Sequence, residues 1–202
     1  CAAITTGSRV LLRGKTILVS NHTYISSVSN FIIEGDGATI KMKDGTTVSS
    51  GYEILSFRSC TDFAIRNVNI NGNRANRTPA EVAAHNIEFR SCQRFIAERV
   101  RSINAVVDGF ILNTATNTDT ATYVRDFVMF ECTADNSYRQ GASIINAYNG
   151  VILGGAYTNT TGTAPQAGID IESNTGATLG NAWILVKGAS FRGNVGRGIL
   201  VS

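Results

Sequence analysis

The tetrapeptide Phe57-Arg58-Ser59-Cys60 returns letter for letter as Phe89-Arg90-Ser91-Cys92, 32 positions further along the chain. The flanking sequence repeats with it, because Phe63-Ala64-Ile65 is followed at the same spacing by Phe95-Ile96-Ala97 and then by Phe127-Val128-Met129. A period of about 20 to 50 residues is typical of solenoid folds. Each unit consists of short alternating runs broken by Gly, Asn, Asp and Ser, which indicates one coil of a β-solenoid. Residues one period apart then lie about 4.8 Å apart, so the surface is organised in columns.

The repeat continues beyond these units, after 24 residues at Val151-Ile152-Leu153 and after another 33 at Ile184-Leu185-Val186. We therefore expect an all-β fold, a right-handed single-stranded parallel β-helix of about six to seven coils, as one domain over residues 1–202. Residues 1–30 are expected to form the first coil. The last five residues are strand-like, and a solenoid needs a cap over its last edge, so we expect a fragment of a longer chain without its C-terminal cap.

Strict alternation assigns an apolar set to the inside of each coil. The expected outward residues between the inner ones are Arg66, Glu98 and Phe130. The expected inner residues are Phe63, Ile65, Val68, Phe95, Ala97, Val100, Phe127, Met129, Cys132, Val151, Leu153, Ala156, Ile184, Val186 and Ala189. Because Cys60 and Cys92 are one period apart, they should stack in adjacent coils, and buried free thiols are favoured there over a disulfide.

Composition excludes two classes of partner. Charged residues make up only 16% of the chain and the net charge is +3, without a basic stripe interleaved with aromatic residues, so a nucleic-acid partner is not expected. No apolar stretch approaches the roughly 20 residues of a membrane span, so membrane insertion is not expected.

A second strand in each coil gives columns of outward residues. One column contains Arg58, Arg90, Asn113, Ile145 and Glu172, and the next contains Ser56, Glu88, Ile111, Ser143 and Asp170. A third column, at the corner before the strand, contains His85, Asp108, Gln140 and Arg197, beside a glycine column of Gly109, Gly141, Gly168 and Gly198. These glycines indicate either a positive φ or very close stacking of the coils.

Two segments interrupt the repeat. Thr78-Pro79-Ala80-Glu81 has the spacing of a capping box with Pro at the first helical position, so a short helical excursion is expected near 79–84. A second excursion, without secondary structure, is expected over residues 114–122. Both are candidates for the walls of a binding groove.

The chain resembles a right-handed parallel β-helix of the pectate-lyase-like superfamily, and most of all bacteriophage tailspike proteins. The stretches that carry the resemblance are Ile32 to Ile40, Asn104 to Phe110 and Ala167 to Asn174. The resemblance implies binding or cleavage of a bacterial surface polysaccharide along the flank of the helix by a homotrimer in the virion tail. Asn117-Thr118-Asp119 matches one motif of the polygalacturonase-type hydrolases, but the other three motifs are missing, which disfavours that reaction.

Sugar chemistry of this kind needs paired carboxylates, or a base with a cation that neutralises a uronate. Asp170 and Glu172 are two positions apart on one strand, which places their outward carboxylates about 6.6–7 Å apart. We assign catalytic roles to Asp170, Glu172 and Asp108. Substrate-binding roles are assigned to Arg139, Arg90, Tyr138, His85 and Glu88. No metal or cofactor is expected, although the Asp170–Glu172 pair leaves calcium open.

Other interpretations remain open at this point. The same acids are also compatible with a solvated surface, Asp108 with a turn-forming role and His85 with a structural role. The outward Ile111 and Ile145 indicate contact with a neighbouring subunit, which suits a non-catalytic structural or adhesive trimer. A secreted bacterial polysaccharide lyase or epimerase is the third alternative.

Overall fold

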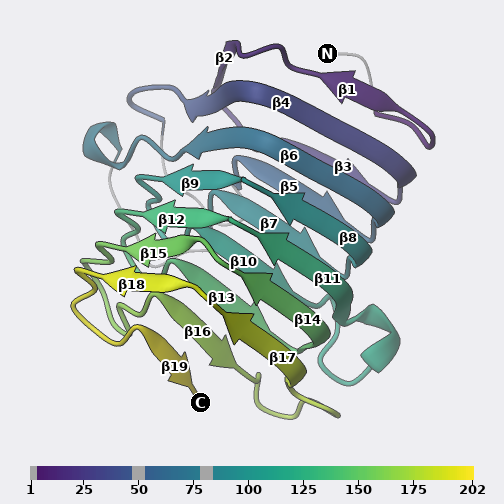
Figure 1. The fold of residues 1–202 in the computed structure, drawn as a ribbon, viewed down its shortest axis with the longest axis vertical. Helices are drawn as coiled ribbons and strands as arrows, with labels where there is room; N and C mark the ends of the chain where they lie inside the picture. The colour runs from purple at the N-terminus through teal and green to yellow at the C-terminus, as the bar shows by residue number, and fades with distance from the viewer. Residues whose placement is uncertain (1–3, 47–52, 78–83) are drawn as a thin grey trace.

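The computed structural model describes residues 4–46, 53–77 and 84–202, which form a stack of parallel strands running from the N-terminal to the C-terminal end of the molecule (Figure 1). Helical structure in these residues consists of two 3₁₀ turns, η1 (Arg74–Asn76) and η2 (Thr120–Thr122). The predicted all-β solenoid is thereby confirmed.

The described strands form a 12-stranded and a seven-stranded sheet, both parallel. Two long strands, β4 (Ser29–Met42) and β6 (Thr61–Asn71), bend through the larger sheet and join its two sides. Its other strands are β1 (Arg9–Leu11), β2 (Thr16–Val19), β8 (Gln93–Glu98), β9 (Arg101–Ile103), β11 (Val124–Phe130), β12 (Thr133–Asp135), β14 (Ala147–Leu153), β15 (Ala156–Thr158), β17 (Ala182–Lys187) and β18 (Ser190–Arg192). The smaller sheet contains β3 (Tyr24–Ser26), β5 (Leu55–Arg58), β7 (Ile87–Arg90), β10 (Phe110–Asn113), β13 (Ala142–Ile145), β16 (Ile169–Glu172) and β19 (Ile199–Val201).

The centre of the coils is filled by stacked aromatic rings. Phe31, Phe63, Phe95 and Phe127 lie above one another with ring centroids 4.8, 5.1 and 5.6 Å apart. In the register of the strands, each of these residues pairs with the next. A single coil cannot bury such rings, so the core exists only because the coils stack. The predicted inner residues from residue 63 to 132 are all buried.

The predicted inner set is wrong for one coil. Phe127 pairs with Gly150 rather than with Val151, so Ile152 points inward, whereas Val151 and Leu153 lie on the outer side. The prediction is shifted by one residue because Gly150 has no side chain that marks the inner position. A Cβ at Gly150 would collide with the ring of Phe127. The same shift explains why Ala156 is outward.

The cysteine prediction is confirmed, since Cys60, Cys92 and Cys132 are buried free thiols. The glycine column is explained by close stacking and not by a positive φ. A Cβ on Gly109 would lie 2.6 Å from the carbonyl oxygen of Gly141 in the next coil.

Residues 79–83 of the predicted helical excursion lie outside the described residues. The second excursion was predicted to be unstructured, and this is wrong. It contains η2, in which the Asp119 carboxylate accepts a hydrogen bond from the Ala121 N–H. The Asn117 side-chain oxygen accepts further hydrogen bonds from Asn146 (2.9 Å) and Asn174 (3.0 Å). Asn117 and Asp119 therefore hold loops together, which is a structural role for the partial polygalacturonase motif.

Candidate functional site

The predicted columns lie on the outer side of the seven-stranded sheet. Strand register places Ser56 beside Glu88, Glu88 beside Ile111, and Ser143 beside Asp170. Backbone hydrogen bonds stack the corner residues in the same way, from Ile54 N to His85 O, Asn86 N to Asp108 O, and Gly109 N to Gln140 O. The geometry of the columns was therefore predictable from the spacing of the repeat.

The outer side of this sheet is not a solvated surface. Asp170 is only 1% exposed, and His85, Glu88 and Asp108 are also buried. The apolar Ile111 (5% exposed) and Ile145 (9% exposed) are covered within the chain itself. The argument that these two isoleucines need a neighbouring subunit is therefore wrong, as is the interpretation of Asp170 as a solvated acid.

Asp108 is the centre of a buried polar network. Its carboxylate accepts two hydrogen bonds from Arg139, Nε to Oδ1 at 2.9 Å and Nη2 to Oδ2 at 2.6 Å. The Ser143 hydroxyl donates to Oδ2 at 2.9 Å, and His85 Nδ1 lies 3.1 Å from the same oxygen. Burial opposes ionisation of Asp108, but His85 and Arg139 outweigh burial and lower its pKa to about 2. Asp108 is therefore a fixed anion that holds Arg139 and His85 in place.

The network continues from Asp108 to Asp170 in two steps. The side-chain oxygen of Gln140 is a second acceptor beside the Ser143 hydroxyl and shares its single proton with Asp108, and the Gln140 amide donates to Oδ2 of Asp170. The other carboxylate oxygen of Asp170, Oδ1, is buried without a hydrogen-bond partner among the described residues. Burial, and then the charge of Glu172, raise the pKa of Asp170 to about 6. In one network, the pKa of Asp170 is thus above the usual aspartate value and that of Asp108 is below it. Such a difference is typical of a general acid beside a carboxylate that stays ionised.

A second cluster is centred on Glu88 of β7. Arg58 donates to Glu88 (3.1 Å) and Glu53 (3.2 Å), and Glu88 also accepts from Ser56 (2.6 Å) and Asn113 (3.1 Å). Burial, and then Glu88, raise the pKa of Glu53. Glu53 was missed in the sequence, although it stands 32 residues before His85 and therefore belongs to the same corner column.

The remaining predicted residues lie at the margin of this network. Glu172 and Arg90 are half-buried, and the structure gives neither side chain a hydrogen bond to the described residues. Tyr138 packs against a different group, because the guanidinium of Arg74 lies 5.1 Å from the centre of its ring. The structure therefore brings His85, Asp108, Arg139 and Asp170 together, and places Tyr138 outside their hydrogen bonds.

Calcium gains no support from the described part of the chain, where no group of three or more His, Cys, Asp and Glu side chains has an arrangement suited to a metal. Likewise, none of the described helical segments is long and apolar enough to cross a bilayer.

The sequence matches no known protein family and none of the curated proteins with which it was compared. Its structure is similar to the pre-mature gene product 12 of bacteriophage phi29, with a TM-score of 0.62 and 15% sequence identity over 95% of this chain. This similarity agrees with the parallel β-helix fold that the repeat predicts. The chain is a parallel β-helix.

A second similar structure is that of a candidate glycosyl hydrolase from Parabacteroides merdae, with a TM-score of 0.55 and 12% identity over 87% of this chain and 82% of the other. At these identities the likeness concerns the fold alone. This β-helix spans about 30% of the length of the phi29 protein.

Proposed function

We propose that this β-helix is the glycan-contacting part of a bacteriophage tailspike, and that it binds and depolymerises a bacterial surface polysaccharide at the outer side of the seven-stranded sheet. The observation that carries the proposal is Asp170, a buried carboxyl group with one unpartnered oxygen and a pKa of about 6. Such a group is protonated often enough near neutral pH to act as a general acid. The phage protein and the candidate hydrolase among the similar structures support this choice of context.

In this proposal Asp170 protonates the leaving oxygen and Glu172 is the second carboxylate. Their positions two residues apart on β16 give a separation of about 6.6–7 Å, at the lower boundary of the range for inverting enzymes. Asp108 acts as a positioning residue, because it fixes Arg139, which with Arg90 holds acidic groups of the glycan. His85 and Glu88 supply further polar groups on the same side of the seven-stranded sheet. Tyr138 supplies an aromatic surface at the edge of this site. Because Asp170 is only 1% exposed, the glycan can reach it only when the side chains around it move.

The test is incubation of the chain with purified capsular polysaccharides and lipopolysaccharides, with product length followed by size-exclusion chromatography. Asp170→Asn and Glu172→Gln should each abolish shortening and retain glycan binding. Matched controls are Asp126→Asn, on β11 of the other sheet, and Glu131→Gln, directly after β11, and both should keep full activity. If both site variants stay fully active, or if binding occurs without shortening in the unaltered chain, the catalytic proposal is wrong. Unsaturated uronate in the products would indicate a lyase.

A non-catalytic trimeric β-helix is the second candidate, and a different surface favours it. Ile96 and Phe130, 39% and 37% exposed, lie on the outer side of the larger sheet. Ile96 belongs to an outward apolar ladder whose residues pair across successive coils, namely Ile32, Ala64, Ile96, Val128, Val151 and Leu185. Phe130 lies beside this ladder, two positions after Val128 on β11. Identical copies with the same rung spacing could pack along this ladder. Analytical ultracentrifugation of the unaltered chain and of Ile96→Glu tests the trimer. A trimer held by the ladder should dissociate to monomers in Ile96→Glu, and a monomeric mass for the unaltered chain would exclude the trimer.

A further inference from the structure

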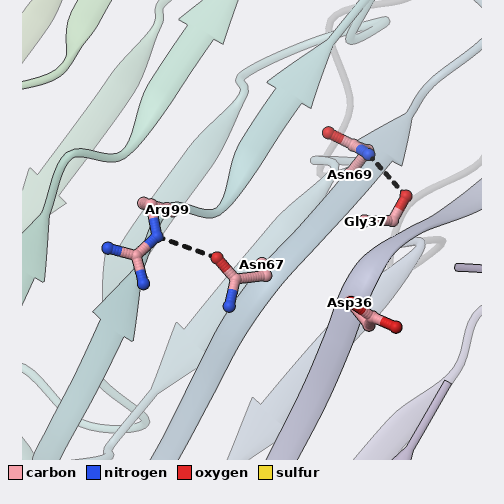
Figure 2. Close-up of a pocket in the computed structure, with 5 residues that line it drawn as sticks. All are labelled: Asp36, Gly37, Asn67, Asn69 and Arg99. Carbon is pink, nitrogen blue, oxygen red and sulfur yellow. Dashed lines mark hydrogen bonds between the residues drawn. The ribbon is translucent and has the colours of Figure 1, made fainter. Parts of the chain in front are cut away.

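A polar hollow lies far from the Asp170 network, where β4 and β6 bend between the two sides of the larger sheet. Its volume is about 450 Å³, and its walls are formed by Asp36, Gly37, Asn67, Asn69 and Arg99 (Figure 2). It exists because the register shifts between Glu34 and Ala38, so that β4 has three residues where β6 has only Asn67. The additional residues of β4 form one wall of the hollow.

The walls are fixed by hydrogen bonds within the chain. Arg99 Nε donates to the Asn67 side-chain oxygen at 2.8 Å, and the Asn67 amide donates to Glu34 at 2.8 Å. The Asn69 amide donates to the carbonyl oxygen of Gly37 at 3.0 Å, and Arg99 Nη2 lies 2.5 Å from Glu98. Figure 2 shows these two bonded pairs side by side, with Asp36 next to Gly37. A wall that is already ordered loses little conformational entropy when a ligand binds.

Three groups of the wall remain available to a ligand. The Asp36 carboxylate, the Asn69 side-chain oxygen and Arg99 Nη1 have no hydrogen-bond partner among the described residues. Two of them accept hydrogen bonds and one donates. A suitable ligand must therefore donate and accept at neighbouring positions, as the hydroxyl groups of a sugar do.

Charges of both signs surround the hollow. The acids are Asp36, Glu34 and Glu98, and the bases are Arg66, Arg99 and Arg101, the last of which pairs with Asn69 on the neighbouring strand, so a ligand of a single charge such as phosphate gains no net attraction. A bare cation would face the Arg99 guanidinium. The volume lies within the range of small-molecule sites, which is about 300–1,000 Å³.

We propose that this hollow binds one neutral sugar unit of a surface glycan. The proposal rests on the glycan-binding function, and it adds a second, non-catalytic contact on another side of the solenoid. A bacterial surface displays many copies of the same glycan, so a weak second site increases the avidity of the whole protein without changing the site at Asp170.

The experiment is an NMR titration of the chain with methyl glucoside, methyl galactoside and N-acetylglucosamine at millimolar concentrations. The side-chain amide signals of Asn67 and Asn69 and the Nε–H signal of Arg99 report on the hollow. Glucuronate, inorganic phosphate and glycerol serve as the anionic and non-sugar comparisons. At least one neutral sugar should shift these signals with saturation, while the three comparison compounds should not.

Arg99→Ala should weaken this binding at least about tenfold, because it removes a charged hydrogen-bond donor. Arg94→Ala is the matched control, because Arg94 lies on β8, which ends one residue before Arg99, is similarly exposed and likewise bonds to a side chain one coil earlier. Asp170→Asn should leave sugar binding in the hollow unchanged, which separates this proposal from the catalytic one. The absence of saturable shifts with every neutral sugar, or equal shifts with phosphate, glucuronate or glycerol, would overturn it.

Discussion

Asp108 and Arg139 are joined by two hydrogen bonds across adjacent coils, with the Asp108 carboxylate completely buried. A pair with the same bidentate geometry exists at the surface, where Arg94 donates to Asp62 at 2.7 and 2.8 Å. The chain therefore contains its own control for the effect of burial on an ion pair.

The buried pair predicts a pH-dependent loss of stability in Asp108→Asn. The pKa of Asp108 is about 2 in the folded chain and about 3.9 when unfolded, so its ionised form stabilises the fold above the unfolded value, and this contribution is lost as the pH falls toward 2. Denaturant unfolding should show a loss of about 2–3 kcal/mol at pH 7 and about half of that at pH 3. Asp62→Asn should cause a much smaller loss at both pH values. Equal losses in the two variants would show that burial of the Asp108 pair does not matter.

The glycine column predicts a large effect of a single methyl group. In Gly109→Ala the new Cβ meets the Gly141 carbonyl oxygen and the Cβ of Ala134, which is 2.9 Å away, and both belong to paired coils that cannot easily move. We expect destabilisation of about 3 kcal/mol in urea unfolding. In Gly176→Ala nothing lies within 4 Å, so only the cost of its positive φ remains, about 1 kcal/mol.

Much of this architecture was predictable from the sequence because a strict period determines both strand register and columns. His85, Asp108 and Gln140 could be aligned without coordinates for that reason. The coil around Gly150 was misaligned because a missing side chain removes the only signal of inward direction. Burial of Asp170 could not be predicted, since it depends on what covers the outer side of the sheet rather than on alternation. The hydrogen bonds between Ser143, Gln140 and Asp170 depend on side-chain rotamers, which no spacing encodes.

The aromatic ladder predicts unequal effects of two phenylalanine substitutions. Phe95 stacks on Phe63, Phe89 and Phe127, whereas Phe130 lies on the outer side of the same sheet. Phe95→Ala should reduce the free energy of unfolding by about 3–5 kcal/mol, because it leaves a cavity in a continuous stack. Phe130→Ala should cost less than about 1 kcal/mol. Similar losses in both variants would contradict the assignment of inward and outward faces.

The thiol ladder predicts slow chemistry in the folded chain. Burial raises the pKa of Cys92 and raises that of Cys132 to about 12, so these two thiols form little thiolate. The hydrogen bond with Cys92 lowers the pKa of Cys60 to about 7, so Cys60 is protected from reagents by its complete burial and not by its pKa. In Cys1→Ser, a thiol reagent such as dithionitrobenzoate should react with these cysteines only after denaturant is added. Rapid reaction of all three thiols before unfolding would show that solvent and reagent reach the interior of the coils.

The protonation of Asp170 tests the account most directly, because the proposed acid role depends on it. Carbon-13 NMR of the Asp170 carboxyl group, assigned by comparison with Asp170→Asn, should give a titration midpoint near pH 6. The midpoint should fall in Glu172→Gln, since the negative charge of Glu172 helps to raise the pKa of Asp170. A midpoint of about 4 or lower, as for an aspartate in water, would contradict the assignment of Asp170 as a buried general acid.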